Sequence, residues 1–166
     1  MDTPEGTVDA LVETPQGSRK KYELDHDRRA MRLDRRIFSA TVYPVDYGLI
    51  PGTEGADGEE LDILIVTEEP TFPGCWVTAR PIGVCWIAYD DQREAKIIAV
   101  PHGDPTWDDV TDLDDLPDHI RDEIGHFFEV YKTLEPGRTP TTDGWEGRDA
   151  AMSVIADATT GRDAEA

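Results

Sequence analysis

The sequence predicts a mainly β protein with some α-structure, an α+β fold built as a small barrel with helices packed beside it. Short segments rich in β-branched and aromatic residues recur along the chain, and turn sequences such as TPQG at 14–17 and FPG at 72–74 separate them. Many short strands with close turn signals are typical of small barrels. One later segment has apolar residues at helical spacing, which indicates a helix. The 166 residues suit a single domain over 1–166.

Seven segments have the residue types and the alternation of β-strands. In chain order they are 8–12, 21–24, 40–43, 62–66, 76–79, 84–89 and 96–100. The small polar stretches at the two ends, 1–7 and 158–166, are expected to be frayed, which leaves a core at about 8–156.

Two helices are expected after the last of these strands. The longer one covers 117–134, because Pro117 suits a first helical position and Pro136-Gly137 would end the helix. Its apolar stripe at 120, 124, 127, 128 and 131 should pack on the barrel. A shorter helix is expected at 148–156.

The charge of the chain excludes some classes of partner. The formal net charge is −20, from 36 acidic and 16 basic residues, which opposes binding to nucleic acid because phosphate attraction would have the wrong sign. No apolar run approaches the roughly 20 residues of a membrane span, and the N-terminus lacks a signal-peptide pattern. We therefore expect a cytoplasmic protein with no membrane partner.

Two further features could suggest metal or redox chemistry but have simpler explanations. Cys75 and Cys85 lack a zinc-site spacing and are interpreted as free core thiols, although a disulfide stays possible. The run 104–118 holds seven Asp and no basic residue. Its spacing matches no calcium loop, so it is interpreted as a solvated acidic connector.

The stretch DGEELD at 57–62 is the strongest candidate for chemistry. A tight turn at Gly58 followed by a strand could direct Asp57, Glu59 and Asp62 toward one point. Clustered carboxylates repel one another and are costly to bury without a positive partner, so a hard cation such as Mg²⁺ is their natural ligand. An exposed acidic turn is the alternative.

Basic residues and tyrosines occur where they could face such a metal cluster. By two-residue alternation, Lys21 shares a strand face with Glu23, and Lys96 shares one with Glu94. Further candidates precede a strand, surround Pro44 or end the long helix; they are Arg35, Tyr43, Tyr47, Tyr131 and Lys132. Each also has an ordinary explanation, such as a solvated lysine or a core tyrosine with a wet hydroxyl.

Taken together, these motifs resemble those of a known family. The motifs are, in chain order, KKYELD, LDRR, YPVDYG, DGEELDILIV, ARPIGV, EAKIIAVPH, DLPDHI, HFFEVYKTLE and GWEG. Their order and spacing resemble those of the soluble family I inorganic pyrophosphatases over about residues 8–155. The resemblance implies a five-stranded OB-like barrel flanked by one long and one short helix. It also implies hydrolysis of pyrophosphate to two phosphates with several Mg²⁺ ions, or with Mn²⁺.

The resemblance also implies a role for each matching residue. Asp57, Asp62, Glu94 and Glu23 would bind metal, with Asp62 bridging two ions. Glu59 would accept the proton of the attacking water, so Glu59 and Asp62 are the expected catalytic pair. The expected substrate-binding residues are Lys21, Arg35, Tyr47, Tyr131 and Lys132, supported by Lys96 and Tyr43.

Three positions depart from the family pattern. Glu59 and Glu94 stand where the family usually has Asp, and Tyr89 stands at a further Asp position, for which Asp90 or Asp91 could substitute as a metal ligand. A catalytic group displaced by about 1 Å can lose on the order of a hundredfold in rate. A weakly active or non-catalytic phosphate- or nucleotide-binding or assembly module, and a phosphohydrolase of altered substrate, therefore stay open.

The family resemblance also implies a homohexamer. His126 on the long helix corresponds to an interface histidine of bacterial members, although a buried core histidine is an alternative interpretation.

Overall fold

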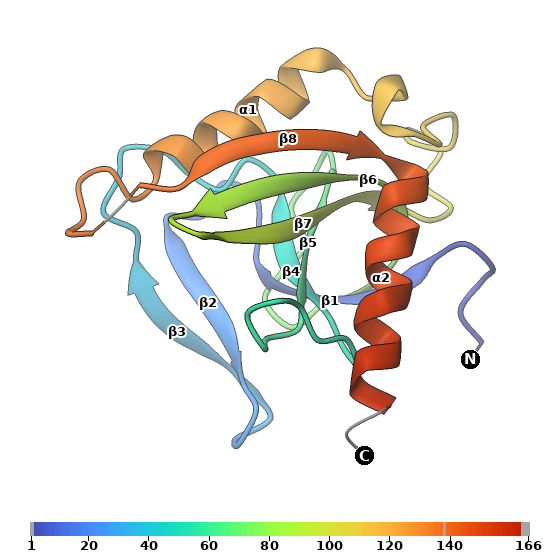
Figure 1. Cartoon of the computed structure of the whole chain (residues 1–166), viewed down its shortest axis with the longest axis horizontal. Helices are drawn as coiled ribbons and strands as arrows, with labels where there is room; N and C mark the ends of the chain where they lie inside the picture. Colours follow the sequence, from blue (N-terminus) through green and yellow to red (C-terminus); the bar gives the residue numbers. More distant parts are fainter. Residues whose placement is uncertain (1, 138, 164–166) are drawn as a thin grey trace.

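A computed structural model describes residues 2–137 and 139–163, in which the chain forms eight β-strands, two α-helices and one 3₁₀ helix (Figure 1). The strands are β1 (Val8–Thr14), β2 (Lys20–Asp25), β3 (Ala30–Arg36), β4 (Asp46–Ile50), β5 (Leu61–Ile65), β6 (Trp76–Tyr89), β7 (Gln92–Pro101) and β8 (Thr141–Gly147). The helices are η1 (Leu113–Asp115), α1 (Asp118–Val130) and α2 (Arg148–Asp163).

Five of the strands form the closed barrel that the sequence predicts. The sheet order is β1-β4-β5-β7-β6, and a further pairing of β1 with β6 closes the ring. Only β5 and β7 run parallel; the other neighbouring pairs in this ring are antiparallel. Because the ring is closed, each of its five strands is paired on both sides over at least part of its length. Strand β8 extends the sheet by pairing with β6.

One long strand, β6, replaces two strands that the sequence predicted separately at 76–79 and 84–89. Its first part pairs with β1 and its second part with β8, and the register shifts between Pro81 and Gly83. Pro81, which cannot donate to a strand ladder, lies between the two predicted segments. The strand continues because the Pro81 carbonyl accepts a hydrogen bond from Arg148 of α2 and β7 pairs along both parts.

Strands β2 and β3 form a two-stranded hairpin beside the barrel (Figure 1). The sequence predicted β2 but missed β3, whose residues AMRLDRR are mostly polar and partly exposed. Thr14 joins this hairpin to β1, because its hydroxyl accepts from the Tyr22 amide at 3.0 Å and donates to the Tyr22 carbonyl at 3.1 Å. The hairpin base is thereby fixed against the barrel.

The strand predicted at 40–43 is wrong, because this segment is a loop. Its β-branched and aromatic residues reflect packing, since Tyr43 is 3% exposed within the core. The loop is held by hydrogen bonds from the Gly17 amide to the Tyr43 carbonyl (2.8 Å) and from the Tyr43 amide to the Ser18 carbonyl (3.1 Å). The sequence also missed β4 and β8; in β8, TTDGWEG, two glycines and an aspartate weaken the strand signal.

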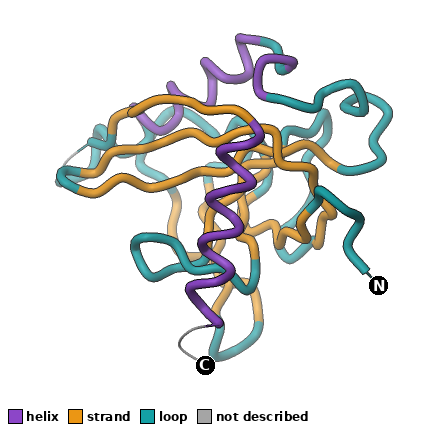
Figure 2. Tube along the Cα trace, turned by 45° about the vertical axis from the view of Figure 1, so that its right-hand side comes forward, coloured by secondary structure: helices purple, strands orange, loops and turns teal. Residues whose placement is uncertain are grey.

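The two helices differ from the prediction in their lengths. Helix α1 spans 13 residues, shorter than the predicted 117–134, and α2 spans 16 residues rather than the short helix expected at 148–156. Figure 2 shows α2 running along the outside of the barrel, where Ala151, Ile155 and Ala158 join the core. No described helix is long and apolar enough to cross a membrane.

Among the described residues, parts of both stretches that were expected to be frayed have defined structure. Helix α2 continues into the stretch 158–166, which was expected to be frayed, because Ala158 is buried at 7% exposure. Near the N-terminus, the Gly6 carbonyl accepts a hydrogen bond from Arg148 at 2.9 Å. Residues 1 and 164–166 lie outside the described part. The core therefore extends beyond 8–156.

Two other sequence interpretations can be compared with the structure. Cys75 and Cys85 are both free thiols, and Cys85 is buried while Cys75 is half-buried. The acidic connector 104–118 exposes most of its carboxylates, although Trp107, Val110 and Leu113 pack into the protein. Arg80 anchors this connector by donating to the Trp107 and Val110 carbonyls at 2.7 and 2.8 Å.

Candidate active site

A cavity of about 610 Å³ collects most of the residues that the sequence singled out. It lies between the barrel, the hairpin β2–β3 and the end of α1. Eleven of the thirteen predicted site residues line it: Lys21, Glu23, Tyr43, Tyr47, Asp57, Glu59, Asp62, Glu94, Lys96, Tyr131 and Lys132. Arg35 and Asp90 are not among its lining residues. The structure thus brings all but two of the predicted residues together around one space.

The strand register explains why three of these side chains meet. Asp62 on β5 lies beside Lys96 on the parallel strand β7, and Glu94 lies two residues before Lys96, so both β7 side chains point to the same face. Lys96 makes ion pairs with Asp62 and, at 3.1 Å, with Glu94. The ammonium group therefore lies between the two carboxylates.

Burial and charge act in opposite directions on Lys96. The residue is only 3% exposed, which by itself lowers the pKa, but Asp62 and Glu94 outweigh this effect and raise it. The Lys96 ammonium also lies 3.5 Å from the hydroxyl of Tyr47. Burial, followed by the negative charge of Asp62, raises the pKa of Tyr47 well above its usual range, so this phenol stays protonated.

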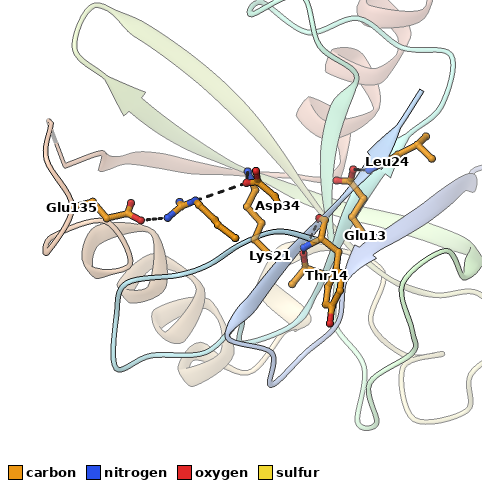
Figure 3. A network of polar contacts seen from close by, with 8 residues as sticks. Glu13, Thr14, Lys21, Leu24, Asp34 and Glu135 are labelled. Atoms are coloured by element: carbon orange, nitrogen blue, oxygen red, sulfur yellow. Dashed lines mark hydrogen bonds and ion pairs between the residues drawn. The ribbon is translucent and has the colours of Figure 1, made fainter. Parts of the chain in front are cut away.

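The hairpin contributes one positively charged side chain to the cavity and directs another away from it. Lys21 pairs with Asp34 at 3.5 Å, and both are labelled in Figure 3. Arg35 pairs with Glu135, which follows α1, and lies 3.8 Å from Asp34. Arg35 would have to leave Glu135 to reach a substrate, which explains why it does not line the cavity.

The acidic loop at 57–59 is exposed. Gly58 has a positive φ of 81°, which suits glycine, and the Glu59 amide donates to the Asp57 carboxylate at 3.0 Å. The Gly55 amide also donates to the Glu59 carbonyl at 2.7 Å. The backbone of the turn is thus fixed, while its carboxylates remain accessible to cations.

The last turn of α1 and the residues after it form another part of the wall. Tyr131 stacks on Phe127 with 4.8 Å between ring centroids. The Lys132 ammonium lies 5.3 Å from the Tyr131 ring and 5.6 Å from the Tyr89 ring. These contacts hold the lysine against the aromatic part of the wall.

Several lining residues were missed as functional candidates; among them are Glu13, His26, Glu60 and Tyr89. Glu13 is the most informative of them, because it is a carboxylate between the buried residues Val12 and Thr14 of β1, and that contrast was a usable signal. It accepts a hydrogen bond from the Leu24 amide at 2.8 Å (Figure 3). Burial raises its pKa to about 7.

Asp90 and Asp91 lie in the exposed turn that joins β6 to β7. Asp90 has a positive φ of 56°, a conformation that Asp tolerates in tight turns. The side chain that does line the cavity at this point is Tyr89. Neither aspartate is brought to the cavity in this conformation, so the role of Asp90 as a metal ligand stays a prediction.

The chemistry of the cavity fits hard divalent cations. Carboxylates from four different segments line it, at Glu23, Asp57, Asp62 and Glu94, and carboxylate oxygen is the ligand type that such ions prefer. Among the described residues, no group of three acidic, histidine or cysteine side chains forms a ready-made metal site. The carboxylates share one space, and they would have to converge around an ion.

The combination of groups defines a class of protein. Carboxylates suited to cations, together with lysines and tyrosine hydroxyls suited to phosphate oxygens, indicate an enzyme that acts on a small phosphorylated compound. Placed at the mouth of a closed barrel, they give a compact, polar site.

Comparison with known proteins gives the family. A family model described as inorganic pyrophosphatase matches residues 10–161, and the chain belongs to this family. An inorganic pyrophosphatase of Leifsonia xyli is 46% identical over 147 residues, which is 89% of this chain and 90% of the relative. One of Methanosarcina acetivorans is 44% identical over 159 residues, 95% and 94% of the two chains. The crystal structure of the Thermus thermophilus inorganic pyrophosphatase superposes with a TM-score of 0.94 at 36% identity, covering 98% of this chain and 95% of that one.

Proposed function

We propose that the chain hydrolyses inorganic pyrophosphate to two orthophosphates in the cavity at the barrel mouth, with Mg²⁺ as its cation. Membership of the inorganic pyrophosphatase family supports the reaction and a divalent metal cofactor. The single structural observation that carries the proposal is that carboxylates, lysines and tyrosine hydroxyls line one cavity. Pyrophosphate needs both kinds of partner, because its high negative charge must be neutralised before a nucleophile can approach.

The metal would be held by carboxylates that already face the cavity. Asp57, Asp62 and Glu94 are the proposed main ligands and Glu23 a further one; all four line the space. Bound cations would balance the charge of pyrophosphate and lower the pKa of a water molecule toward neutrality. Carboxylate donors suit Mg²⁺, which is the proposed ion, and they also suit Mn²⁺.

The protein side chains would bind the substrate and move one proton. Glu59 would accept the proton of the attacking water, whose oxygen forms the new bond to one phosphorus while the bridging P–O bond breaks and the second phosphate leaves. Lys21, Lys132 and the hydroxyl of Tyr131 would donate to phosphate oxygens. Tyr47, Tyr43 and Lys96 would support the wall, and Arg35 would join after leaving Glu135.

The proposal predicts Mg²⁺-dependent release of phosphate from pyrophosphate by the purified chain. A binding module predicts that pyrophosphate binds in calorimetry without being hydrolysed, and a phosphohydrolase of altered substrate predicts faster release from another phosphoanhydride. Comparing pyrophosphate with a panel of phosphoanhydrides separates these outcomes. Binding of pyrophosphate without any release at saturating Mg²⁺ would reject the proposal.

Two wider properties also stay predictions. We propose a homohexamer in the cytoplasm, on the basis of the family resemblance. His126 is exposed and borders a hollow of about 300 Å³ with Glu123 and Phe127. The alternative of a buried core histidine is thereby wrong, and an interface role for His126 becomes testable by size measurement.

A further inference from the structure

Tyr89 forms the part of the cavity wall that lies near two lysines. It is the last residue of β6, and its ring centroid lies 5.6 Å from the Lys132 ammonium and 5.9 Å from the Lys96 ammonium. A lysine ammonium within about 6 Å of an aromatic ring is attracted to the electron-rich face. The Tyr89 ring packs against the core cluster that contains Phe127 and Phe128, which limits its freedom to move.

Lys132 differs from the other lysines of the cavity in how its charge is balanced. Lys96 pairs with Asp62 and Glu94, and Lys21 pairs with Asp34. Within residues 2–137 and 139–163, Lys132 makes no ion pair. Its ammonium is instead held by two rings, those of Tyr89 and Tyr131. A ring attracts the ammonium without cancelling its charge, so the charge remains available to a phosphate group.

The two tyrosines that hold Lys132 act on the same ammonium. It lies 5.6 Å from the Tyr89 ring and 5.3 Å from the Tyr131 ring, and both tyrosines line the cavity. Tyr131 is fixed from the other side by its stacking on Phe127 at 4.8 Å. The rings therefore form a rigid support that continues into the core.

We propose that Tyr89 is a positioning residue for substrate binding, which, together with Tyr131, holds the Lys132 ammonium in the cavity ready for a phosphate group of pyrophosphate. The inference rests on the proposed function. An aliphatic residue at position 89 would leave the lysine free to rotate away, and ordering this long side chain again would then weaken binding. A carboxylate at position 89 would compete with phosphate for the same ammonium.

The test combines Tyr89→Leu, Tyr89→Phe, Lys132→Met and the double variant Tyr89→Leu/Lys132→Met. The probe is methylenediphosphonate, a pyrophosphate analogue that cannot be hydrolysed at its bridge, titrated in a calorimeter with Mg²⁺ present. We expect Tyr89→Leu to bind it on the order of threefold to tenfold more weakly and to raise KM for pyrophosphate similarly, with kcat little changed. Tyr89→Phe keeps the ring and should bind within about twofold of wild type.

The double variant decides whether Tyr89 acts through Lys132. In the Lys132→Met background, Tyr89→Leu should have no further effect on binding. Equal losses from Tyr89→Leu in both backgrounds, or a Tyr89→Phe loss as large as that of Tyr89→Leu, would overturn the proposal. Thermal unfolding checks each variant, and Tyr89→Met replaces Tyr89→Leu should the latter not fold.

The outcome for wild type separates this inference from the proposed function. A wild-type chain that binds methylenediphosphonate but releases no phosphate from pyrophosphate would reject the proposed function, while the calorimetric comparison would still test Tyr89. An active wild type with independent effects of Tyr89 and Lys132 would reject only the role of Tyr89. Absence of analogue binding by an active wild type would also overturn that role.

Discussion

At the scale of single residues, the candidate site is defined by how each charge is balanced. Lys96 is neutralised by Asp62 and Glu94, whereas Lys132 is supported by aromatic rings. Glu59 is exposed, on a backbone turn fixed by hydrogen bonds. The same cavity therefore contains groups that hold one another in place and groups that remain free to meet a substrate.

Glu59→Gln tests the proposed proton acceptor. The substitution keeps the size of the side chain but removes its basicity, so kcat for pyrophosphate should fall by about 10²–10⁴-fold, the usual contribution of a general base. Glu69→Gln removes the same charge at an exposed position that does not line the cavity and should leave kcat unchanged. A Glu59→Gln rate equal to wild type would show that another group accepts the proton.

Glu13 makes stability depend on pH in the absence of divalent ions. Burial raises its pKa from 4.5 to about 7 in the folded state, so the folded chain takes up a proton more readily than the unfolded chain. The stability contributed by this proton is complete below pH 4.5 and is lost as the pH rises through about 7. Urea unfolding with EDTA from pH 4.5 to 8 should therefore show wild type losing stability relative to Glu13→Gln, by about 3 kcal/mol at most. A constant difference between the two proteins across this range would contradict the assignment.

The residues of the site could be predicted to the extent that they follow strand alternation. Lys21 and Glu23, like Glu94 and Lys96, reach the cavity in pairs because alternate side chains share a strand face. Arg35 could not be placed in this way, because its orientation depends on Glu135, a hundred positions further along the chain. Tyr89 was interpreted as standing in place of a missing ligand, since its contact with Lys132 exists only in the folded chain.

At the scale of elements, the predictable strands are the apolar ones of the barrel. Strands β5 and β7, which the sequence predicted at 62–66 and 96–100, contain runs of buried apolar residues, and their composition indicates this burial. Strand β4 is also mostly buried but was missed, because its short sequence DYGLI contains Asp and Gly, which are rare in strands. Strands β3 and β8 are polar and form because β2 and β6 offer them unpaired backbone groups. Such pairing is a tertiary effect that local propensity does not contain. The same explanation applies to α2, whose later turns depend on packing of Ala158 against the barrel.

Asp46 at the start of β4 joins two loops to the barrel. Its buried carboxylate accepts hydrogen bonds from the Gln16 amide (2.8 Å) and from the Thr71 amide (3.1 Å) and hydroxyl (2.6 Å). Asp46→Ala would leave the buried donors without this acceptor and should lower the free energy of unfolding by about 2–4 kcal/mol. Chemical denaturation measures this loss, with Asp108→Ala, at an exposed position, as the control. Equal stability of the two variants would contradict the role given to Asp46.

At the scale of the whole molecule, the net charge of −20 opposes close association of several copies. Salt screens exposed charges beyond about 10 Å at 0.1 M ionic strength. If the excess charge is an adaptation to a salt-rich habitat, the proposed hexamer should dissociate at low salt and assemble as salt is added. Light scattering or sedimentation across an ionic-strength series measures this, and the same mass at every salt concentration would reject the prediction.

The central claim is that the cavity around Asp62 hydrolyses pyrophosphate with the help of Mg²⁺. It is tested most directly by initial rates of phosphate release across a Mg²⁺ series, for wild type and Asp62→Asn. We predict saturable, Mg²⁺-dependent release by wild type and a loss of at least about a hundredfold in Asp62→Asn, with thermal unfolding showing that the variant is folded. No release by wild type, or a folded Asp62→Asn variant as active as wild type, would contradict the account.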